Sequence, residues 1–179
     1  IRGLVGSEMC IRDSSINAPL NTMDTCGTGG DGKNSLNIST ATAFVLAASG
    51  IPIAKHGNRA LTSKCGSADV LKALNINVDM ETSKLEDCLR NIGICFMFAP
   101  NHHPAMKHVA QVRQLLGFRT IFNMLGPLLN PANVRNQIVG VYSKEVFNNY
   151  KEVFEKEEKK VCLIAGHDGN DEISLSGIN

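Results

Sequence analysis

The sequence lacks the features that mark nucleic-acid-binding, membrane-spanning and disulfide-stapled proteins. Its 179 residues carry a net charge of +1, which provides neither a basic field for a nucleic-acid backbone nor an acidic surplus for a cationic partner. No apolar run approaches the roughly 20 residues needed to cross a bilayer, and no secretory signal pattern is present. Six cysteines occur without a paired short spacing, which is typical of reduced thiols. We therefore expect a soluble, cytoplasmic protein with a small-molecule ligand and no nucleic-acid or membrane partner.

Length and composition favour one α/β core, since 43% of the residues are hydrophobic. Residues 1–14, IRGLVGSEMCIRDS, show neither helical nor strand periodicity and do not lead into the next segment. We interpret them as an unmatched leader, artefactual or disordered, and residues 15–179 as the folded domain.

From Asn17 onward short apolar runs alternate with amphipathic ones, a pattern that predicts a mostly parallel sheet flanked by helices. Strands are expected at Thr22–Cys26, Ile51–Ala54, Ile94–Phe98, Gln137–Tyr142 and Val161–Ala165. Helices are expected after Ser35 or Asn37 up to Gly50, from about Ser67, and at Ser83–Asn91, Ala105–Leu116 and Lys144–Lys156. The charged run Lys151–Lys160 is expected to be a solvated helix face.

A glycine-rich loop, Gly27 to Gly32, stands between the first strand and the first helix. Backbone amides and a helix N-terminus in this arrangement form an anion site that suits phosphate or pyrophosphate. Asp31 lies inside the loop, where a carboxylate would repel phosphate unless a metal or a ribose hydroxyl intervened. The loop therefore predicts a sugar phosphate bound with magnesium.

Three other interpretations of the loop are weighed. Gly27, Gly29 and Gly32 satisfy the dinucleotide pattern, but Lys55-His56 stands where that site needs an acidic residue. The loop almost fits a nucleotide P-loop, but Asn34 stands where Ser or Thr should coordinate magnesium. An ordinary glycine-rich turn is the third.

Five segments, the loop among them, form a pattern along the chain. Gly27-Thr-Gly-Gly-Asp, Asn37-Ile-Ser-Thr40, Lys55-His-Gly-Asn-Arg59, Gly66-Ser-Ala-Asp69 and Asn123-Met-Leu-Gly-Pro127 resemble, in order and spacing, the signature segments of anthranilate phosphoribosyltransferases. The resemblance implies the nucleoside phosphorylase/phosphoribosyltransferase catalytic fold. It also implies transfer of the phosphoribosyl group of 5-phosphoribosyl 1-pyrophosphate (PRPP) to the amine of anthranilate, releasing pyrophosphate, in tryptophan biosynthesis. Positioning and electrostatics should carry this chemistry without a covalent intermediate, with Lys55, Asn58 and Arg113 as positioning groups.

The resemblance also implies the site residues. Magnesium would be held by Ser39, Asp171 and Glu172, and anthranilate by Gly27, Asn58, His103 and Arg113. His102, His103 and His108 together suggest a zinc cluster, but no cysteine or carboxylate has the matching ligand spacing. PRPP would be bound by Gly27, Gly30, Asp31, Ser35, Asn37, Ile38, Ser39, Thr40, Lys55, His56, Gly57, Asn58, Arg59, Ala60, Leu61, Thr62, Ser63 and Ser67.

The resemblance covers only part of the family pattern. The family's small N-terminal helical domain and its C-terminal strands and helices have no match here, so the chain is expected to be a truncated catalytic domain of a protein that is a homodimer when complete. Two other functions are weighed: a pyrimidine nucleoside phosphorylase, which Lys55–Arg59 and Asp171-Glu172 argue against, and a non-catalytic nucleic-acid-binding member of the fold, which the net charge argues against.

Overall fold

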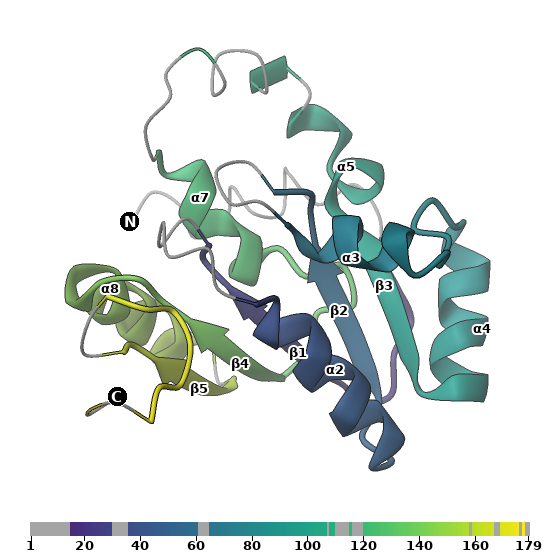
Figure 1. Ribbon diagram of the computed structural model, residues 1–179, viewed down its shortest axis with the longest axis horizontal. Helices are drawn as coiled ribbons and strands as arrows, with labels where there is room; N and C mark the ends of the chain where they lie inside the picture. Colours follow the sequence, from purple (N-terminus) through teal and green to yellow (C-terminus); the bar gives the residue numbers. More distant parts are fainter. Residues whose placement is uncertain are drawn as a thin grey trace.

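The protein is a five-stranded parallel sheet with helices on both faces, seen in the computed structural model (Figure 1). The structure describes residues 15–29, 36–60, 65–106, 108–109, 115, 120–157, 159–166, 169–175 and 177. The strands are β1 (Met23–Gly27), β2 (Ile53–Gly57), β3 (Ile94–Phe98), β4 (Asn136–Gly140) and β5 (Lys160–Ile164). All pairings are parallel, in the order β3-β2-β1-β4-β5. The predicted fold class is confirmed.

Helices α2 (Ile38–Ala48) and α3 (Ser67–Ala73) cover one face of the sheet. In α3, Ala68 and Leu71 pack against Phe96 and Phe98 of β3. Helix α2 crosses in front of β1 and β2 in Figure 1 and buries Ala43. These contacts leave the N-termini of both helices near the carboxyl ends of the strands.

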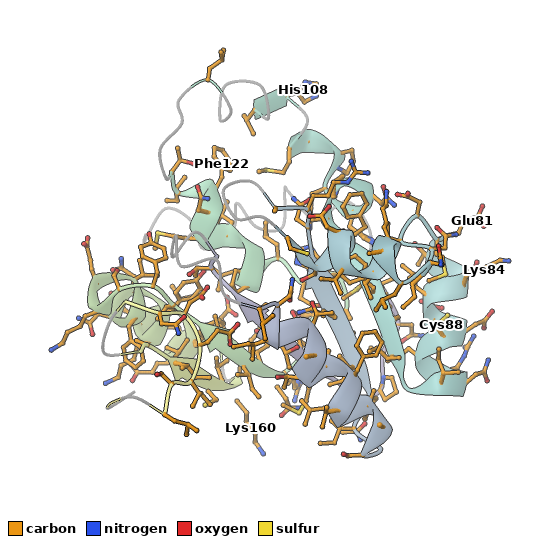
Figure 2. The ribbon with its side chains drawn as sticks, in the orientation of Figure 1. Glu81, Lys84, Cys88, His108, Phe122 and Lys160 are labelled. Carbon is orange, nitrogen blue, oxygen red and sulfur yellow. The ribbon has the colours of Figure 1, made fainter. Side chains whose placement is uncertain are left out.

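Helices α4 (Thr82–Ile92) and α8 (Lys144–Lys156) cover the opposite face. Leu85 and Leu89, four residues apart on α4, pack against Cys95 and Met97 of β3. Glu81 before α4 and Lys84 within it point away from the sheet (Figure 2).

The predicted bounds of helix α8 are confirmed, and its capping residue and buried stripe explain them. The Ser143 hydroxyl accepts from the Val146 N–H at 3.3 Å and caps the first turn. Val146, Tyr150 and Phe154 form the buried stripe, which packs on Val139. The outward face carries the ion pair Lys156–Glu152, as expected of a solvated face, although the charged run is helical only to Lys156 and Lys160 begins β5.

Short helices beyond the carboxyl edge of the sheet complete the described chain. They are α5 (Ala99–His102), the 3-10 turns η1 (Pro104–Met106) and η2 (Gly126–Leu128), and α7 (Phe122–Leu125). Of these, α5, α7 and η2 were not predicted. The predicted helix Ala105–Leu116 lies mostly outside the described residues, and its described beginning is the η1 turn.

Strand β2 is the clearest boundary error of the sequence analysis. It was expected at Ile51–Ala54, with Lys55-His56 at its end, but it runs from Ile53 to Gly57. Both polar side chains are almost fully buried inside the strand. The error arose because buried polar residues do not follow the apolar pattern that sequence analysis uses to end a strand.

Candidate functional site at the carboxyl ends of the strands

The sheet changes direction between β1 and β4. From β1 the chain proceeds to β2 and β3 on one side, whereas β4 and β5 are added on the other. Ligands of open parallel sheets bind outside the carboxyl ends of the strands at such a switch point. Gly27 ends β1 and Gly140 ends β4, and the two glycines are register partners. The sequence-predicted glycine loop therefore begins at the switch point.

Asp171 reaches this point from the other end of the chain. Its Oδ2 accepts a hydrogen bond from the Gly29 N–H at 3.0 Å. A Cβ on Gly27 would lie 2.8 Å from the same oxygen, and a Cβ on Gly140 would lie 1.6 Å from the Asp171 carbonyl oxygen. Both strand ends need glycine because the Asp171 segment packs directly on them.

The N-terminus of α2 lies beside the same strand ends. Asn37 caps it by accepting from the Thr40 N–H at 3.2 Å, and the Ser39 hydroxyl lies 3.5 Å from the Asn37 Oδ1. The Thr25 hydroxyl donates to the Ser39 carbonyl at 2.8 Å, which ties β1 to the first turn of α2. Of the predicted caps, Asn37 is confirmed, and Ser35 lies outside the described residues.

Two threonine hydroxyls near the β1–α2 junction are buried without a hydrogen-bond partner among the described residues. Thr28 follows β1, and Thr40 is in the first turn of α2. A buried hydroxyl without a partner is costly, because it gives up its bonds to water. These oxygens are available to a polar ligand.

Lys55 is buried between β1 and α2. Its ammonium donates to the Thr25 carbonyl and, at 3.3 Å, to the Ser39 hydroxyl. Burial lowers its pKa, and the charges of Asp24 and Glu172 oppose that decrease. An ammonium has three N–H groups, so these bonds leave Lys55 one more proton to donate. The Lys55 ammonium therefore lies beside the N-terminus of α2.

The segment after β2 is held by Asp69 of α3. One carboxylate oxygen, Oδ2, accepts from the Ala60 N–H at 3.0 Å and from the Gly66 N–H at 2.9 Å. These backbone bonds lower the pKa of Asp69. The Ala68 N–H donates to the Asn58 carbonyl at 3.2 Å, so the segment from Asn58 to Ala60 is bonded to the start of α3.

Other predicted residues of this segment also lie near the end of β2. The Arg59 guanidinium stacks over the Phe98 ring, 5.6 Å from its centroid. Ser67 begins α3, and its Cβ would be 3.1 Å from a Cβ added at Gly57. The predicted residue Ile38 belongs to α2 and not to this segment. It is the first residue of that helix and is more than a third exposed.

His56 points to the opposite face of the sheet from Lys55, because successive side chains of a strand alternate. Its Nδ1 lies 3.2 Å from the Gly126 carbonyl oxygen, and its Nε2 lies 3.0 Å from the Nε2 of His103. The two rings meet edge to face, with centroids 5.0 Å apart. Burial, followed by the influence of His103, lowers the pKa of His56 to about 3.

The buried pair Asp24 and Asn130 was not predicted from the sequence. Asp24 Oδ2 accepts from the Asn130 side-chain amide at 2.8 Å, and Oδ1 accepts from the His56 N–H at 3.3 Å. Burial raises the pKa of Asp24, opposed mainly by Lys55. The signal was a carboxylate in the middle of an apolar strand, a residue type rarely buried without a partner.

Some of the predicted metal and substrate residues lie within the part of the chain that the structure describes, and others lie outside it. The predicted metal ligands Ser39, Asp171 and Glu172 lie within it. No three His, Cys, Asp or Glu residues among the described residues cluster tightly enough to hold a metal. His102 and His103 are buried, whereas His108 lies in the segment that follows η1, at the top of Figure 2. Outside the described residues lie Gly30, Asp31, Ser35, Leu61, Thr62, Ser63 and Arg113.

Comparison with known proteins agrees with this architecture. Residues 20–179 match the family described as "Glycosyl transferase family, a/b domain". The chain belongs to this family.

Among curated relatives in sequence, the anthranilate phosphoribosyltransferase of Brevibacillus brevis is 47% identical over 99% of this chain and 53% of its own length. That of Novosphingobium aromaticivorans is 50% identical over 92% of this chain and 50% of its own length. The chain thus spans about half the length of the curated relatives it matches.

Solved structures of family members superimpose closely on the chain. Anthranilate phosphoribosyltransferase from Thermus thermophilus matches with a TM-score of 0.89 and 39% identity, over 96% of this chain and 53% of that one. The Saccharomyces cerevisiae enzyme in complex with PRPP and Mg matches with a TM-score of 0.87 and 34% identity, over 96% and 49%. Another structure of the yeast enzyme, in complex with 4-fluoroanthranilate, has a TM-score of 0.81 at 32% identity and covers 96% and 47%.

Proposed function

We propose that the protein transfers the phosphoribosyl group of PRPP to the amine of anthranilate. The observation that carries the proposal is the meeting of Asp171 with Gly29 at the switch point. It brings the acidic pair to the phosphate-binding loop from a position 142 residues away. The relatives named above have this activity in their names, and the yeast enzyme binds PRPP and Mg.

The phosphate end of PRPP would meet the N-terminus of α2 and Lys55. Backbone N–H groups and the positive end of an eleven-residue helix favour a polyanion. The Lys55 ammonium, with the Asn37 and Ser39 side chains beside it, would neutralise charge on the departing pyrophosphate. The Thr28 and Thr40 hydroxyls would gain partners there.

A magnesium ion fits the donor set at this point. Asp171 and Glu172 supply carboxylate oxygens and Ser39 a hydroxyl, the hard oxygen ligands that magnesium prefers. When bound, the ion would offset negative charge on the pyrophosphate. Asp171 is largely buried against Gly27 and Gly140, so its position is determined by packing before any ligand arrives.

Anthranilate would approach from the side of α5. Its amine attacks the anomeric carbon, the carbon–oxygen bond to pyrophosphate breaks with its electron pair leaving on pyrophosphate, and the amine loses a proton. Asn58 and His103 would position the ring, and the planar guanidinium of Arg113 would pair with the carboxylate. The protein's contribution is orientation and charge stabilisation.

The cellular setting is part of the proposal. The relatives' names support a role in tryptophan biosynthesis. A cytoplasmic location and a homodimer in the complete protein are further parts of the proposal. No helix among the described residues is long and apolar enough to cross a membrane.

Calorimetric titration of PRPP into the full-length protein, with and without magnesium, tests the phosphate site. We expect magnesium-dependent binding that Lys55→Ala weakens at least tenfold, about 1.4 kcal/mol. Lys84→Ala, at an exposed position on α4, is the control and should bind like the wild type. Anthranilate consumption tests the reaction, and Arg113→Ala should raise the KM for anthranilate. Absence of PRPP binding by the folded protein would refute the proposal.

A further inference from the structure

The rings of His56, in β2, and His103, at the end of α5, contact each other. Which nitrogen donates and which accepts follows from the chemistry of their partners. The Gly126 carbonyl oxygen can only accept, so the His56 Nδ1 that faces it at 3.2 Å must carry the proton. A neutral imidazole has one N–H, which leaves the His56 Nε2 as an acceptor. The His103 Nε2, 3.0 Å away, must then donate.

The surroundings keep His56 neutral at pH 7. It is buried, and His103, His102 and Lys55 all oppose a positive charge on its ring, so its pKa falls to about 3. Its backbone N–H is bonded to Asp24, and Asp24 is bonded to Asn130. The bond to Asp24 therefore fixes the backbone of His56, and the contact with Gly126 fixes its ring.

We propose that His56 is a positioning residue that fixes His103 as the Nε2-protonated tautomer, through a relay from the Gly126 carbonyl through both imidazoles. His103 is 3% exposed, and its backbone N–H donates to the Ala99 carbonyl at 3.0 Å, so its backbone is fixed too. In this tautomer the neutral ring has a lone pair at Nδ1, so any partner of that atom is a donor.

The relay assigns a role to His103 in substrate recognition, an assignment that rests on the proposed function. When the His103 ring is neutral, it brings no positive charge to the carboxylate of an aromatic amino acid, and its Nδ1 accepts from a donor such as an amine rather than donating to a carboxylate. The positive charge for the carboxylate would then come from Arg113. His56 maintains the positions of the donor and the acceptor on the His103 ring, and it need not contact the substrate itself.

Two substitutions separate the halves of the relay. In His56→Asn the side-chain N–H occupies the place of Nδ1, so it can donate to Gly126 but cannot reach His103. In His56→Gln the amide oxygen occupies the place of Nε2, so it can accept from His103 while the Nδ1 bond is lost. The two variants differ in which hydrogen bond survives and also in size, since the asparagine side chain is one methylene shorter, so the tautomer of His103 decides between them.

The ring nitrogens of the full-length protein, labelled with 15N at histidine, report the tautomers by NMR, and single substitutions of the other histidines assign them. We expect His56 to be protonated at Nδ1 and His103 at Nε2 in the wild type at pH 7. His103 should keep this tautomer in His56→Gln and interconvert between both in His56→Asn. The KM for anthranilate should rise about tenfold in His56→Asn and less than threefold in His56→Gln.

A charged or Nδ1-protonated His103 in the wild type would overturn the inference. An Nε2-protonated His103 that persists in His56→Asn would overturn it too, because packing changes alone would leave the tautomer unchanged. If His56→Asn fails to fold, the wild-type tautomers and the His56→Gln variant still decide. If the wild type consumes no anthranilate, the proposed function fails while the tautomers still test the relay.

Discussion

Asp171 accepts a hydrogen bond from the Gly29 N–H at 3.0 Å, which joins the C-terminal part of the chain to the loop that follows β1. The bond has a charged acceptor and lies where the sheet changes direction. Hydrogen bonds to charged groups are stronger than those between neutral groups. This contact orders one side of the site.

Asp171→Asn removes the charge and keeps the size of the side chain. We expect magnesium-dependent PRPP affinity to fall roughly ten- to a hundredfold, in line with losses of a charge-assisted contact. Titration calorimetry with and without magnesium measures it. Asp87→Asn, at an exposed position on α4, is the control. Unchanged affinity in Asp171→Asn would remove Asp171 from the metal site.

Gly140→Ala should destabilise the protein strongly. The added Cβ would lie 1.6 Å from the Asp171 carbonyl oxygen, so the backbone must move. Overpacking typically costs about 1–3 kcal/mol, and here we expect at least the upper end. Gly126→Ala is the matched control, since its Cβ meets nothing within 4 Å and its backbone is right-handed helical. Urea unfolding of both variants compares them, and equal stability would contradict the packing described here.

Asp69→Ala should loosen the backbone at Ala60 and Gly66. The carboxylate accepts from two backbone N–H groups, and losing it leaves both without that partner. We expect faster hydrogen exchange at the amides of Ala60 and Gly66 and weaker PRPP binding. In Asp69→Asn the amide oxygen can still accept, so its effects should be smaller. Exchange at these two amides as slow as in the wild type would contradict this prediction.

Acidification should destabilise the fold through the buried histidines. The pKa of His56 is about 3 in the folded protein against 6.5 for an ordinary histidine, so below pH 6.5 the unfolded chain binds a proton that the folded chain does not. Stability is therefore lost as pH falls from about 6.5 towards 3, at up to ~1.4 kcal/mol per pH unit for this residue. His102, with a pKa lowered to about 4 by burial and then by His103, acts in the same direction.

His56→Gln isolates the contribution of His56 to this pH dependence. The variant should lose less stability than the wild type between pH 6.5 and 4, because its unfolded chain gains one proton fewer. Urea unfolding at several pH values measures the two slopes. Identical slopes would mean that His56 is not buried in its neutral form.

Much of the fold could be predicted from local patterns. Strand β3 and helix α8 were predicted with their observed bounds, because Ile94–Phe98 is a short apolar run and α8 has a capping serine with apolar residues at helical spacing. The glycine loop and the Asn37 cap were also visible, since backbone conformation and helix capping restrict residue type locally. Strand β2 was misjudged where Lys55 and His56 are buried, because their partners are distant in sequence.

By itself, the sequence determined the alternation of strands and helices, the position of the glycine-rich loop and the family resemblance, because each depends on residues near one another in the chain. Only the tertiary structure decided that Asp171 meets Gly29, that Asp24 binds Asn130 and that His56 joins Gly126 to His103. These contacts link residues 47 to 142 positions apart. Periodicity shows which face of an element is buried, whereas strand order and register determine which distant polar groups meet at the strand ends.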